Sequence, residues 1–221
     1  MKITIFTLFP EMVEPFFTSS IMKRAVEKGI ITYNIVNFRD YAKGVHRKSD
    51  DEPFGGGAGM VLMPQPLSDA LLDHGAKGKR VIFPTPSGRV FTEAYAEELS
   101  REEELYFICG HYEGIDQRVI DTFVTDEITI GDYVLSSGET STIVVIDALY
   151  RLIEGVITDL SLEDESFNSG LLEYPQYTRP ERFRGKKVPE VLISGHHENI
   201  KRWREEKSLE ITKKNRPDLL K

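Results

Sequence analysis

The sequence predicts an α/β fold, with a parallel sheet covered by helices on both faces and a small helical C-terminal domain. Five short runs rich in Ile, Val, Phe or Tyr alternate with stretches whose apolar residues recur at helical spacing. Such alternation is typical of βαβ units, which place parallel strands between two layers of helices. The alternation stops after Ile157, and a basic segment with helical periodicity follows further along.

The predicted elements follow one another from the N-terminus. We expect strands at Lys2–Leu8, Ile30–Phe38, Lys79–Phe83, Leu105–Cys109 and Asp126–Ile130. We expect helices at Glu11–Val26, Pro66–Asp73, Thr92–Leu99 and Gln117–Phe123. The apolar stretch Ile143–Ile153 predicts a buried helix with Asp147 and Arg151 on one polar edge. A last helix is expected from about His196, with Ile200 and Trp203 on one face.

The predicted domains are residues 1–158, an α/β domain, and residues 171–221, a helical domain, joined by an acidic linker over 159–170. A chain of 221 residues with 40% hydrophobic content can bury one sizeable core and a smaller one. Nothing between Met1 and Pro10 resembles a signal peptide, and no apolar stretch reaches membrane-spanning length. The single cysteine, Cys109, excludes an internal disulfide. We therefore expect a cytoplasmic protein with no membrane partner.

Charge is unevenly distributed along the chain. The formal net charge of −8 argues against a polyanionic partner. From Arg179 to Lys221, however, 13 Lys and Arg stand against 7 Asp and Glu, so this segment carries +6 and residues 1–178 carry −14. Charge alone favours a solvated helix of mixed charge for this segment.

Three glycine-containing loops each follow a predicted strand directly: Pro84–Arg89, Gly110–Asp116 and Gly131–Gly138. In parallel sheets, ligands bind beyond the carboxyl ends of the strands, and glycine lets main-chain groups approach a ligand closely. Each loop alone is typical of an ordinary turn. Three in succession indicate a small-molecule site, such as one that reads an adenine or a ribose by main-chain contacts.

A fourth glycine run, Phe54–Met60, matches neither familiar phosphate-binding motif. It lacks the Lys-Ser/Thr ending of a P-loop, and a dinucleotide fingerprint would need glycine at Met60, which disfavours a nicotinamide dehydrogenase. A flexible linker is the simplest interpretation. The flanking Pro53, Pro64 and Pro66 instead favour a shaped loop whose bare main chain admits a flat base.

Other reactive side chains suggest no site. Cys109 and His111 lack an evident orienting partner, so a buried small hydrophobe is the better interpretation of the cysteine. The run from His196 to Glu198 lacks the zinc-protease spacing and favours a helix start. We predict no metal site.

Distinctive motifs occur in order over nearly the whole chain. In the first domain they are Leu8-Phe-Pro-Glu-Met12, Asn37-Phe-Arg-Asp40, Phe54-Gly-Gly-Gly-Ala-Gly-Met60, Cys109-Gly-His-Tyr-Glu-Gly-Ile-Asp116 and Ile130-Gly-Asp-Tyr-Val-Leu-Ser-Ser-Gly-Glu139. In the second they are Gly170-Leu-Leu-Glu-Tyr-Pro-Gln-Tyr-Thr-Arg-Pro180, Val188-Pro-Glu-Val-Leu-Ile-Ser-Gly-His-His197 and Trp203-Arg204. Together they resemble the motifs of one family, the bacterial tRNA guanine-37 N1-methyltransferases of the trefoil-knotted SPOUT class.

The resemblance implies a trefoil-knotted parallel sheet that binds S-adenosylmethionine, a homodimer with a shared active site, and tRNA as the partner, with no role for DNA. Sequence patterns alone predict an unknotted sheet, because knots are rare exceptions. An Mg²⁺ requirement is also implied, without ligands. Carried over by motif, the cofactor residues are Phe83, Thr85, Pro86, Gly110, Glu113, Ile130, Gly131, Tyr133, Leu135, Ser137 and Gly138.

The same resemblance places catalytic residues around the linker. An arginine falls on Arg151, and the general base falls on Glu165, with Asp164 as the alternative. The family form of the base is aspartate, so Glu165 is a departure that is one methylene longer. A carboxylate that removes the N1 proton of guanine makes that nitrogen nucleophilic, and an arginine near O6 stabilises the charge that develops. Without the resemblance, Glu165 is one more charge in an acidic linker.

Substrate contacts follow in the same way. The target base must leave its stack, because its Watson–Crick edge has to face the methyl donor. Its predicted seat is formed by Gly55, Gly56, Gly57 and Gly59. The predicted phosphate contacts are Arg179, Arg182, Arg184, Lys186 and Lys187. A non-catalytic RNA-binding module, inactivated by the change at position 165, is the alternative from another class.

Overall fold

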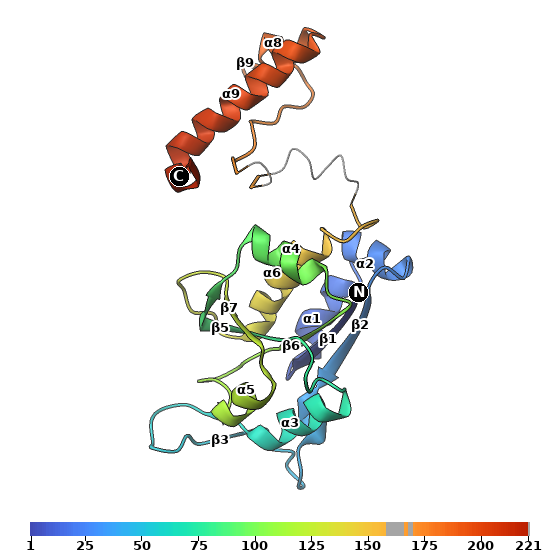
Figure 1. Cartoon of the computed structure of the whole chain (residues 1–221), viewed down its shortest axis with the longest axis vertical. Coiled ribbons are helices and arrows are strands. Elements are labelled where there is room, and N and C mark those ends of the chain that lie inside the picture. Colours follow the sequence, from blue (N-terminus) through green and yellow to red (C-terminus); the bar gives the residue numbers. More distant parts are fainter. Residues whose placement is uncertain (158–165, 168–169, 221) are drawn as a thin grey trace. The chain divides into compact units, whose positions relative to one another are not determined.

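The computed structural model describes residues 1–157, 166–167 and 170–220 of the chain. Asp164 and Glu165, the two candidates for the general base, lie outside the described residues. The chain divides into two compact units, Met1–Ile157 (unit 1) and Thr158–Lys221 (unit 2), whose elements are labelled in Figure 1. No described helix combines the length and the apolar composition that crossing a membrane requires.

Unit 1 is built on a five-stranded sheet in which all neighbouring strands are parallel. The strands are β1 (Lys2–Thr7), β2 (Thr32–Asn37), β5 (Val81–Val90), β6 (Glu104–Ile108) and β7 (Asp126–Thr129), in the order β2-β1-β6-β5-β7. The register places Ile5 of β1 beside Ile35 of β2 and Phe107 of β6. The structure confirms the five strands predicted from hydrophobic runs.

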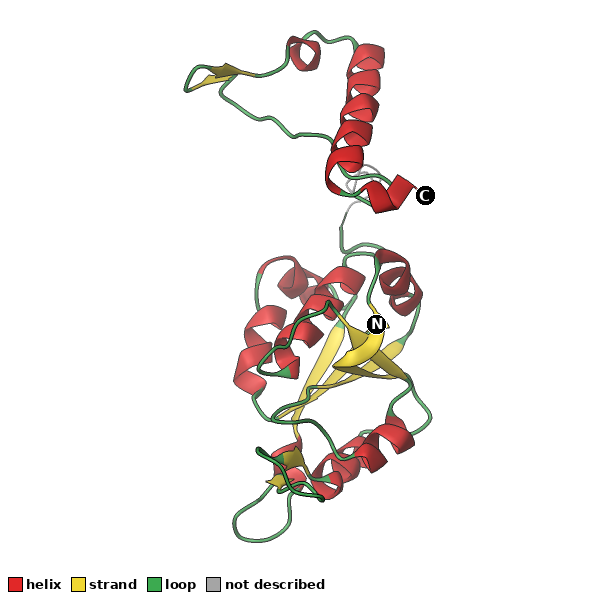
Figure 2. Cartoon of the chain, turned by 90° about the vertical axis from the view of Figure 1, so that its left-hand side faces the viewer, coloured by secondary structure: helices red, strands yellow, loops and turns green. Residues whose placement is uncertain are grey.

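Helices cover both faces of this sheet (Figure 2). One face packs against α1 (Pro10–Phe17), α2 (Ser20–Glu27), α4 (Glu93–Ser100) and α6 (Gly138–Tyr150). The other face packs against α3 (Pro64–Asp73) and α5 (Gln117–Phe123). Side chains alternate along β1, so Ile5 belongs to the first core and Phe6 to the second. The predicted α/β class with a covered parallel sheet is therefore confirmed.

The first helical prediction needs correction, and a hairpin that was not predicted is present. The stretch Glu11–Val26 forms two helices instead of one, because the chain turns after Thr18 and Ser20 has a positive φ of 53°. Short strands and a one-turn helix in this unit were not predicted: η1 (Phe38–Tyr41), β3 (Asp50–Asp51) and β4 (Val61–Leu62). β3 and β4 pair antiparallel, so the fourth glycine run is the loop of a hairpin.

Two further elements begin or end at residues other than those predicted from the sequence. β5 is longer than predicted because it pairs with β7 again after an irregular stretch between Pro84 and Arg89. α6 begins before the predicted Ile143–Ile153 stretch and ends at Tyr150. Arg151 therefore follows this helix instead of lying on its polar edge.

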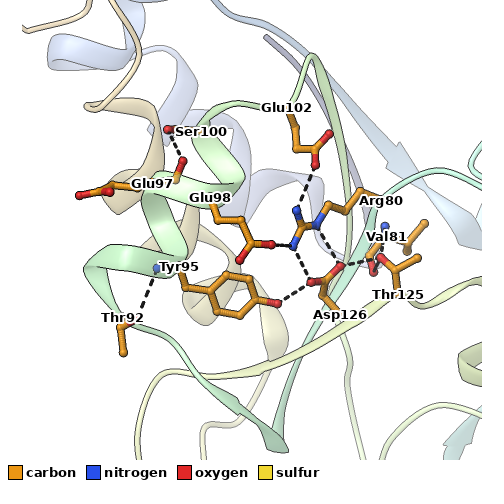
Figure 3. A network of polar contacts seen from close by, with 10 residues as sticks. All are labelled: Arg80, Val81, Thr92, Tyr95, Glu97, Glu98, Ser100, Glu102, Thr125 and Asp126. Atoms are coloured by element: carbon orange, nitrogen blue, oxygen red, sulfur yellow. Dashed lines mark hydrogen bonds and ion pairs between the residues drawn. The ribbon is translucent and has the colours of Figure 1, made fainter.

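An ionic cluster around Arg80 joins the starts of β5 and β7 to α4 (Figure 3). The Arg80 guanidinium donates to Asp126 Oδ2 at 3.1 Å and to Asp126 Oδ1 at 2.9 Å. It also donates to Glu98 and Glu102, and the Tyr95 hydroxyl donates to Asp126. Burial opposes ionisation of Asp126, but the hydrogen bonds from Arg80 and its neighbours hold the pKa of this carboxyl below its usual value. Burial and the bond to Asp126 raise the pKa of Tyr95 to about 12.

The described part of unit 2 contains helices and one short hairpin. Its elements are β8 (Arg182–Phe183), β9 (Lys186–Lys187), α8 (Glu190–Ile193), α9 (His197–Asn215) and η2 (Pro217–Leu220). Within 166–167 and 170–220 Thr212 is the one buried residue, and its hydroxyl accepts a hydrogen bond from Leu172 N at 2.9 Å. The described part of unit 2 therefore has no apolar core.

Candidate functional site

A cavity of about 310 Å³ opens beside the irregular stretch of β5 and at the carboxyl ends of β6 and β7. Its walls are Phe83–Pro86, the glycine-containing loops after β6 and β7, and the first turn of α6. The stretch Pro84–Arg89, predicted as a loop after a strand, lies within β5. Parallel sheets bind ligands at this edge because the strand ends and the loops after them converge there. The three glycine-containing segments therefore line a single cavity.

All eleven residues predicted for the methyl-donor pocket line this cavity. They are Phe83, Thr85, Pro86, Gly110, Glu113, Ile130, Gly131, Tyr133, Leu135, Ser137 and Gly138. Their convergence is a geometric observation, and their role in cofactor binding stays a prediction.

Sequence reasoning missed part of the wall, including His111, Tyr112 and Ser141. The His111 ring lies 5.0 Å from the Phe9 ring and 4.5 Å from the Tyr112 ring, measured between centroids. Its Nδ1 is buried and has no hydrogen-bond partner among the described residues. The sequence could have indicated His111 and Tyr112 as cavity residues, because both lie inside the motif that begins at Cys109.

Glycine backbone lines one side of the cavity, at Gly110 and Gly138. Gly138 N donates to Gly110 O at 2.8 Å, where the loop after β7 meets the loop after β6. A β-carbon at Gly138 would lie 2.5 Å from Gly110 N and 2.9 Å from Cys109 Cα. Both distances are too short for a real side chain, so position 138 requires glycine because two backbones touch there.

Two buried polar side chains lie next to this crossing. Glu139 is buried and accepts a hydrogen bond from Thr7 Oγ1. Cys109 is also buried, and its thiol donates to Thr142 Oγ1 at 3.4 Å. Burial, together with the nearby Glu139 carboxylate, raises the pKa of the Cys109 thiol, which disfavours the nucleophilic thiolate. The interpretation of Cys109 as a buried small side chain is confirmed.

The predicted base seat lies in the β3–β4 loop, which is joined to the cavity wall. Glu113 N donates to Met60 O at 3.1 Å. Gly59 lies so close to Glu113 that a β-carbon would overlap the Glu113 carboxylate. Positive φ angles, which glycine adopts without strain, occur at Gly55, Gly56, Gly57 and Gly59. None of these four lines the cavity itself, but the backbone geometry supports a shaped loop over a flexible linker.

Arg151 lies directly after α6 and beside the start of α4. Its Nη1 is 3.9 Å from Glu93 Oε1, and the two side chains are 24% and 31% exposed. The guanidinium is therefore only partly solvated and has a carboxylate that can orient it. Glu165 and Asp164 lie outside the described residues, so no distance joins them to Arg151.

Unit 2 presents its predicted phosphate contacts mainly on one hairpin. β8 and β9 are antiparallel, with Arg182 opposite Lys187 and Phe183 opposite Lys186. Residues 182–187 are all exposed, and the Arg184 guanidinium carbon lies 5.2 Å from the Phe183 ring centroid. Arg179, also exposed, lies just before the hairpin. These positions form a surface with several cations that water can reach.

Metal-binding side chains do not cluster in the described ranges, 1–157, 166–167 and 170–220, where no three His, Cys, Asp or Glu gather around a possible ion. His196 occupies the position before α9 without a side-chain capping hydrogen bond, and His197 is the first residue of the helix, as the helix-start interpretation predicts.

Comparisons with known proteins point to one family. A family model described as tRNA (Guanine-1)-methyltransferase TrmD matches residues 1–221. Three proteins named tRNA (guanine-N(1)-)-methyltransferase, from Treponema denticola, Borrelia duttonii and Caldicellulosiruptor saccharolyticus, are 60%, 58% and 57% identical to the chain. The alignments cover 100%, 99% and 100% of this chain and 90%, 92% and 90% of those relatives, in the same order.

Proposed function

The chain belongs to the tRNA (guanine-1)-methyltransferase family TrmD, and from this we propose that it transfers a methyl group from S-adenosylmethionine to N1 of guanosine 37 in tRNA, adjacent to the anticodon. The observation that carries the proposal is the cavity beside β5 and the carboxyl ends of β6 and β7, which every motif-assigned cofactor residue lines. The reaction also needs a proton acceptor for N1 and a surface for RNA, and the chain has candidates for both.

The cavity suits a nucleoside with a charged tail. Phe83, Ile130 and Leu135 supply apolar contacts, and Gly110 and Gly138, which also line the cavity, offer main-chain groups for polar contacts. The Glu113 carboxylate favours a cationic ligand. When bound, S-adenosylmethionine supplies an electrophilic methyl group on a positively charged sulfur.

In the proposed reaction, Glu165 takes the N1 proton of guanine, with Asp164 as the alternative base. Removal of this proton leaves a lone pair on N1 for bond formation to the methyl carbon, and negative charge develops towards O6. Arg151 stabilises that charge, and Glu93 orients the guanidinium. The transferred proton stays on the carboxylate until water removes it.

The proposal includes the trefoil knot, a homodimer and a cytoplasmic location. Support for the knot is the main-chain crossing at Gly138 and Gly110. Support for the homodimer is the exposed apolar wall of the cavity, where Tyr133, Val134 and Leu135 are 56%, 84% and 38% exposed. A second protomer would cover these side chains and complete the site.

The proposed tRNA surface has two parts. The cations of the β8–β9 hairpin and Arg179 contact phosphates, which gives binding that salt weakens. The Gly55–Gly59 loop holds the extruded base, because glycine leaves room for a flat ring against the backbone. RNA is the nucleic acid of this proposal, and DNA has no part in it.

Mg²⁺ belongs to the proposal without assigned ligands: in the described residues no three acidic, His or Cys side chains gather, and Mg²⁺ commonly binds through one or two carboxylates together with substrate phosphates. The proposed steps are assigned to the protein's own side chains.

The proposal is tested by incubating the purified protein with methyl-labelled S-adenosylmethionine and a tRNA transcript that carries guanosine at positions 36 and 37. We expect label in this transcript and none in a matched transcript with adenosine at 37. No label in either transcript would contradict the proposed reaction. Binding of both ligands without methyl transfer would instead support the non-catalytic RNA-binding module.

A further inference from the structure

A fully exposed aromatic ring lies beside the proposed base seat and has no part in the function proposed above. Phe54, the first residue of the Phe54–Met60 run, has a relative exposure of 102%. Single exposed apolar residues are common on protein surfaces, so exposure alone assigns no role. Three further observations indicate which chemical group this ring contacts. They are the backbone turn around Phe54, the hydrogen bonds that join this turn's hairpin to the cavity wall, and the nearby charges.

A tight turn holds Phe54 at its corner. Gly56 N donates to Pro53 O at 3.2 Å, which closes a turn with Phe54 and Gly55 at its two central positions. Gly55 has a φ of +92°, as the third residue of a type II turn requires. The exposed ring is therefore presented by an ordered turn.

The same hairpin is hydrogen-bonded to the loop that lines the cavity. Leu62 N donates to Gly114 O at 2.9 Å, and Asp116 N donates to Leu62 O at 3.1 Å. Glu113 N donates to Met60 O at 3.1 Å, and the Glu113 side chain occupies the space that a side chain at position 59 would need. Phe54 thus belongs to the same hydrogen-bonded assembly as the cavity wall.

Charge indicates which part of an RNA can approach this ring. Asp50, Asp51 and Glu52 precede the turn, and Lys48 pairs with Asp51 at 2.7 Å. The remaining negative charge repels phosphate groups. A contact with Phe54 therefore favours the uncharged face of a nucleobase over the RNA backbone.

We propose that Phe54 stacks on a nucleobase that flanks the extruded guanosine. The inference rests on the proposed tRNA methyltransferase function. Extrusion of one base removes a stacking partner from its neighbours, which is part of the energetic cost of flipping. An aromatic ring can replace that partner for any neighbouring base, because every base offers a π face. Phe54 then lowers the cost of extrusion and acts on tRNA recognition without touching the methyl donor.

The test compares three full-length variants, Phe54→Ala, Phe54→Tyr and Phe54→Leu, with the parent protein. Tyrosine keeps the aromatic face, leucine keeps apolar bulk without it, and alanine removes both. Val45→Ala is the matched control, because Val45 is an apolar side chain with 96% exposure on another loop. The readouts are kcat/KM for the tRNA transcript, S-adenosylmethionine affinity by calorimetry, and the mass of the protein in solution by sedimentation.

We expect Phe54→Ala to lower kcat/KM for tRNA by about 5- to 150-fold, the range for one lost base–aromatic stack. Phe54→Leu should lower kcat/KM for tRNA nearly as much as Phe54→Ala does. The values for Phe54→Tyr and Val45→Ala should stay within about two-fold of the parent value. Cofactor affinity and solution mass should match the parent in every variant.

Equal kcat/KM for Phe54→Ala and the parent would overturn the inference and leave the proposed function standing. Full activity of Phe54→Leu would also overturn it, because apolar bulk would then be sufficient. A lower solution mass for Phe54→Ala would show that a second protein copy contacts the ring instead of a base. A parent protein that does not methylate tRNA would remove the proposed function and this inference together.

Discussion

Unit 1 and the described part of unit 2 differ in how they are built. Unit 1 packs apolar side chains on both faces of its sheet and forms a cavity from loops that this packing holds in place. In the described part of unit 2, Thr212 is the one buried residue, and every residue of the basic hairpin is exposed. We infer that the cavity of unit 1 depends on packing, whereas the proposed phosphate contacts of the hairpin depend on charge. Changes in the core of unit 1 should therefore alter stability, whereas changes in the β8–β9 hairpin should alter salt-dependent tRNA binding.

The largest effect is expected at Glu165, the proposed general base. Glu165→Gln should lower the methylation rate by about two to four orders of magnitude, because a positioned base contributes that much. Single-turnover kinetics with tRNA measure the rate, and calorimetry should show unchanged affinity for S-adenosylmethionine. The control is Asp164→Asn, which should stay close to the parent. The opposite pattern would assign the base to Asp164.

A large loss of stability is expected in unit 1 from Arg80→Ala (Figure 3). The Arg80 and Asp126 side chains are 19% and 11% exposed. Removal of the guanidinium leaves a mostly buried carboxylate without its cation, which should cost about 2–4 kcal/mol in the free energy of unfolding. Urea unfolding measures this loss. The exposed pair of Lys23 and Glu27 supplies the control, since Lys23→Ala should change stability by less than about 0.5 kcal/mol. Equal effects of the two substitutions would contradict a structural role for the cluster.

The same cluster predicts how the stability of unit 1 depends on pH. The pKa of Asp126 is lower in the folded protein than in the unfolded chain, so the unfolded chain binds this proton more readily. The contribution of Asp126 is fully present above the unfolded pKa of about 4 and is lost as pH falls further, towards the folded pKa. Unfolding measured from pH 7 to pH 3 should show a shallower decline for Arg80→Ala than for the parent.

A smaller effect, confined to RNA, is expected from the unit 2 hairpin. Changing Arg182, Arg184 and Lys186 to alanine together should weaken tRNA binding by about 10- to 100-fold near physiological salt. The slope of log affinity against log salt concentration should fall by roughly two to three, because about that many phosphate contacts are lost. Filter binding over a salt series measures both quantities. An unchanged slope would refute the assignment of this surface, and unchanged cofactor affinity is the internal control.

The smallest effect is expected from Glu93→Gln, which keeps the size of the side chain and removes its charge. The pair with Arg151 is 3.9 Å apart and partly exposed, so its energetic contribution is modest. We expect kcat to fall by about two- to five-fold with little change in KM for tRNA. A change in KM alone would place Glu93 in substrate binding instead.

Local patterns predicted much of unit 1. Hydrophobic runs predict β1 and β6 because these strands are buried on both faces, and glycines after strands predict the cavity loops. The β3–β4 hairpin was missed because its two-residue strands depend on hydrogen bonds to Gly114 and Asp116, distant in sequence. The Arg80 cluster was missed for the same reason, since Asp126 is 46 positions away. The proposed general base and the proposed catalytic arginine came from family motifs, because a single charged residue in a polar segment has no distinguishing pattern of its own.

The most direct test of the account is mass spectrometry of nucleosides and fragments from a guanosine-37 tRNA transcript, after incubation with the purified protein and S-adenosylmethionine. The account predicts N1-methylguanosine in the fragment that contains position 37 and in no other fragment, with almost none when Glu165→Gln replaces the parent. A transcript that stays unmodified, or a methyl group found on another atom or nucleotide, would contradict it.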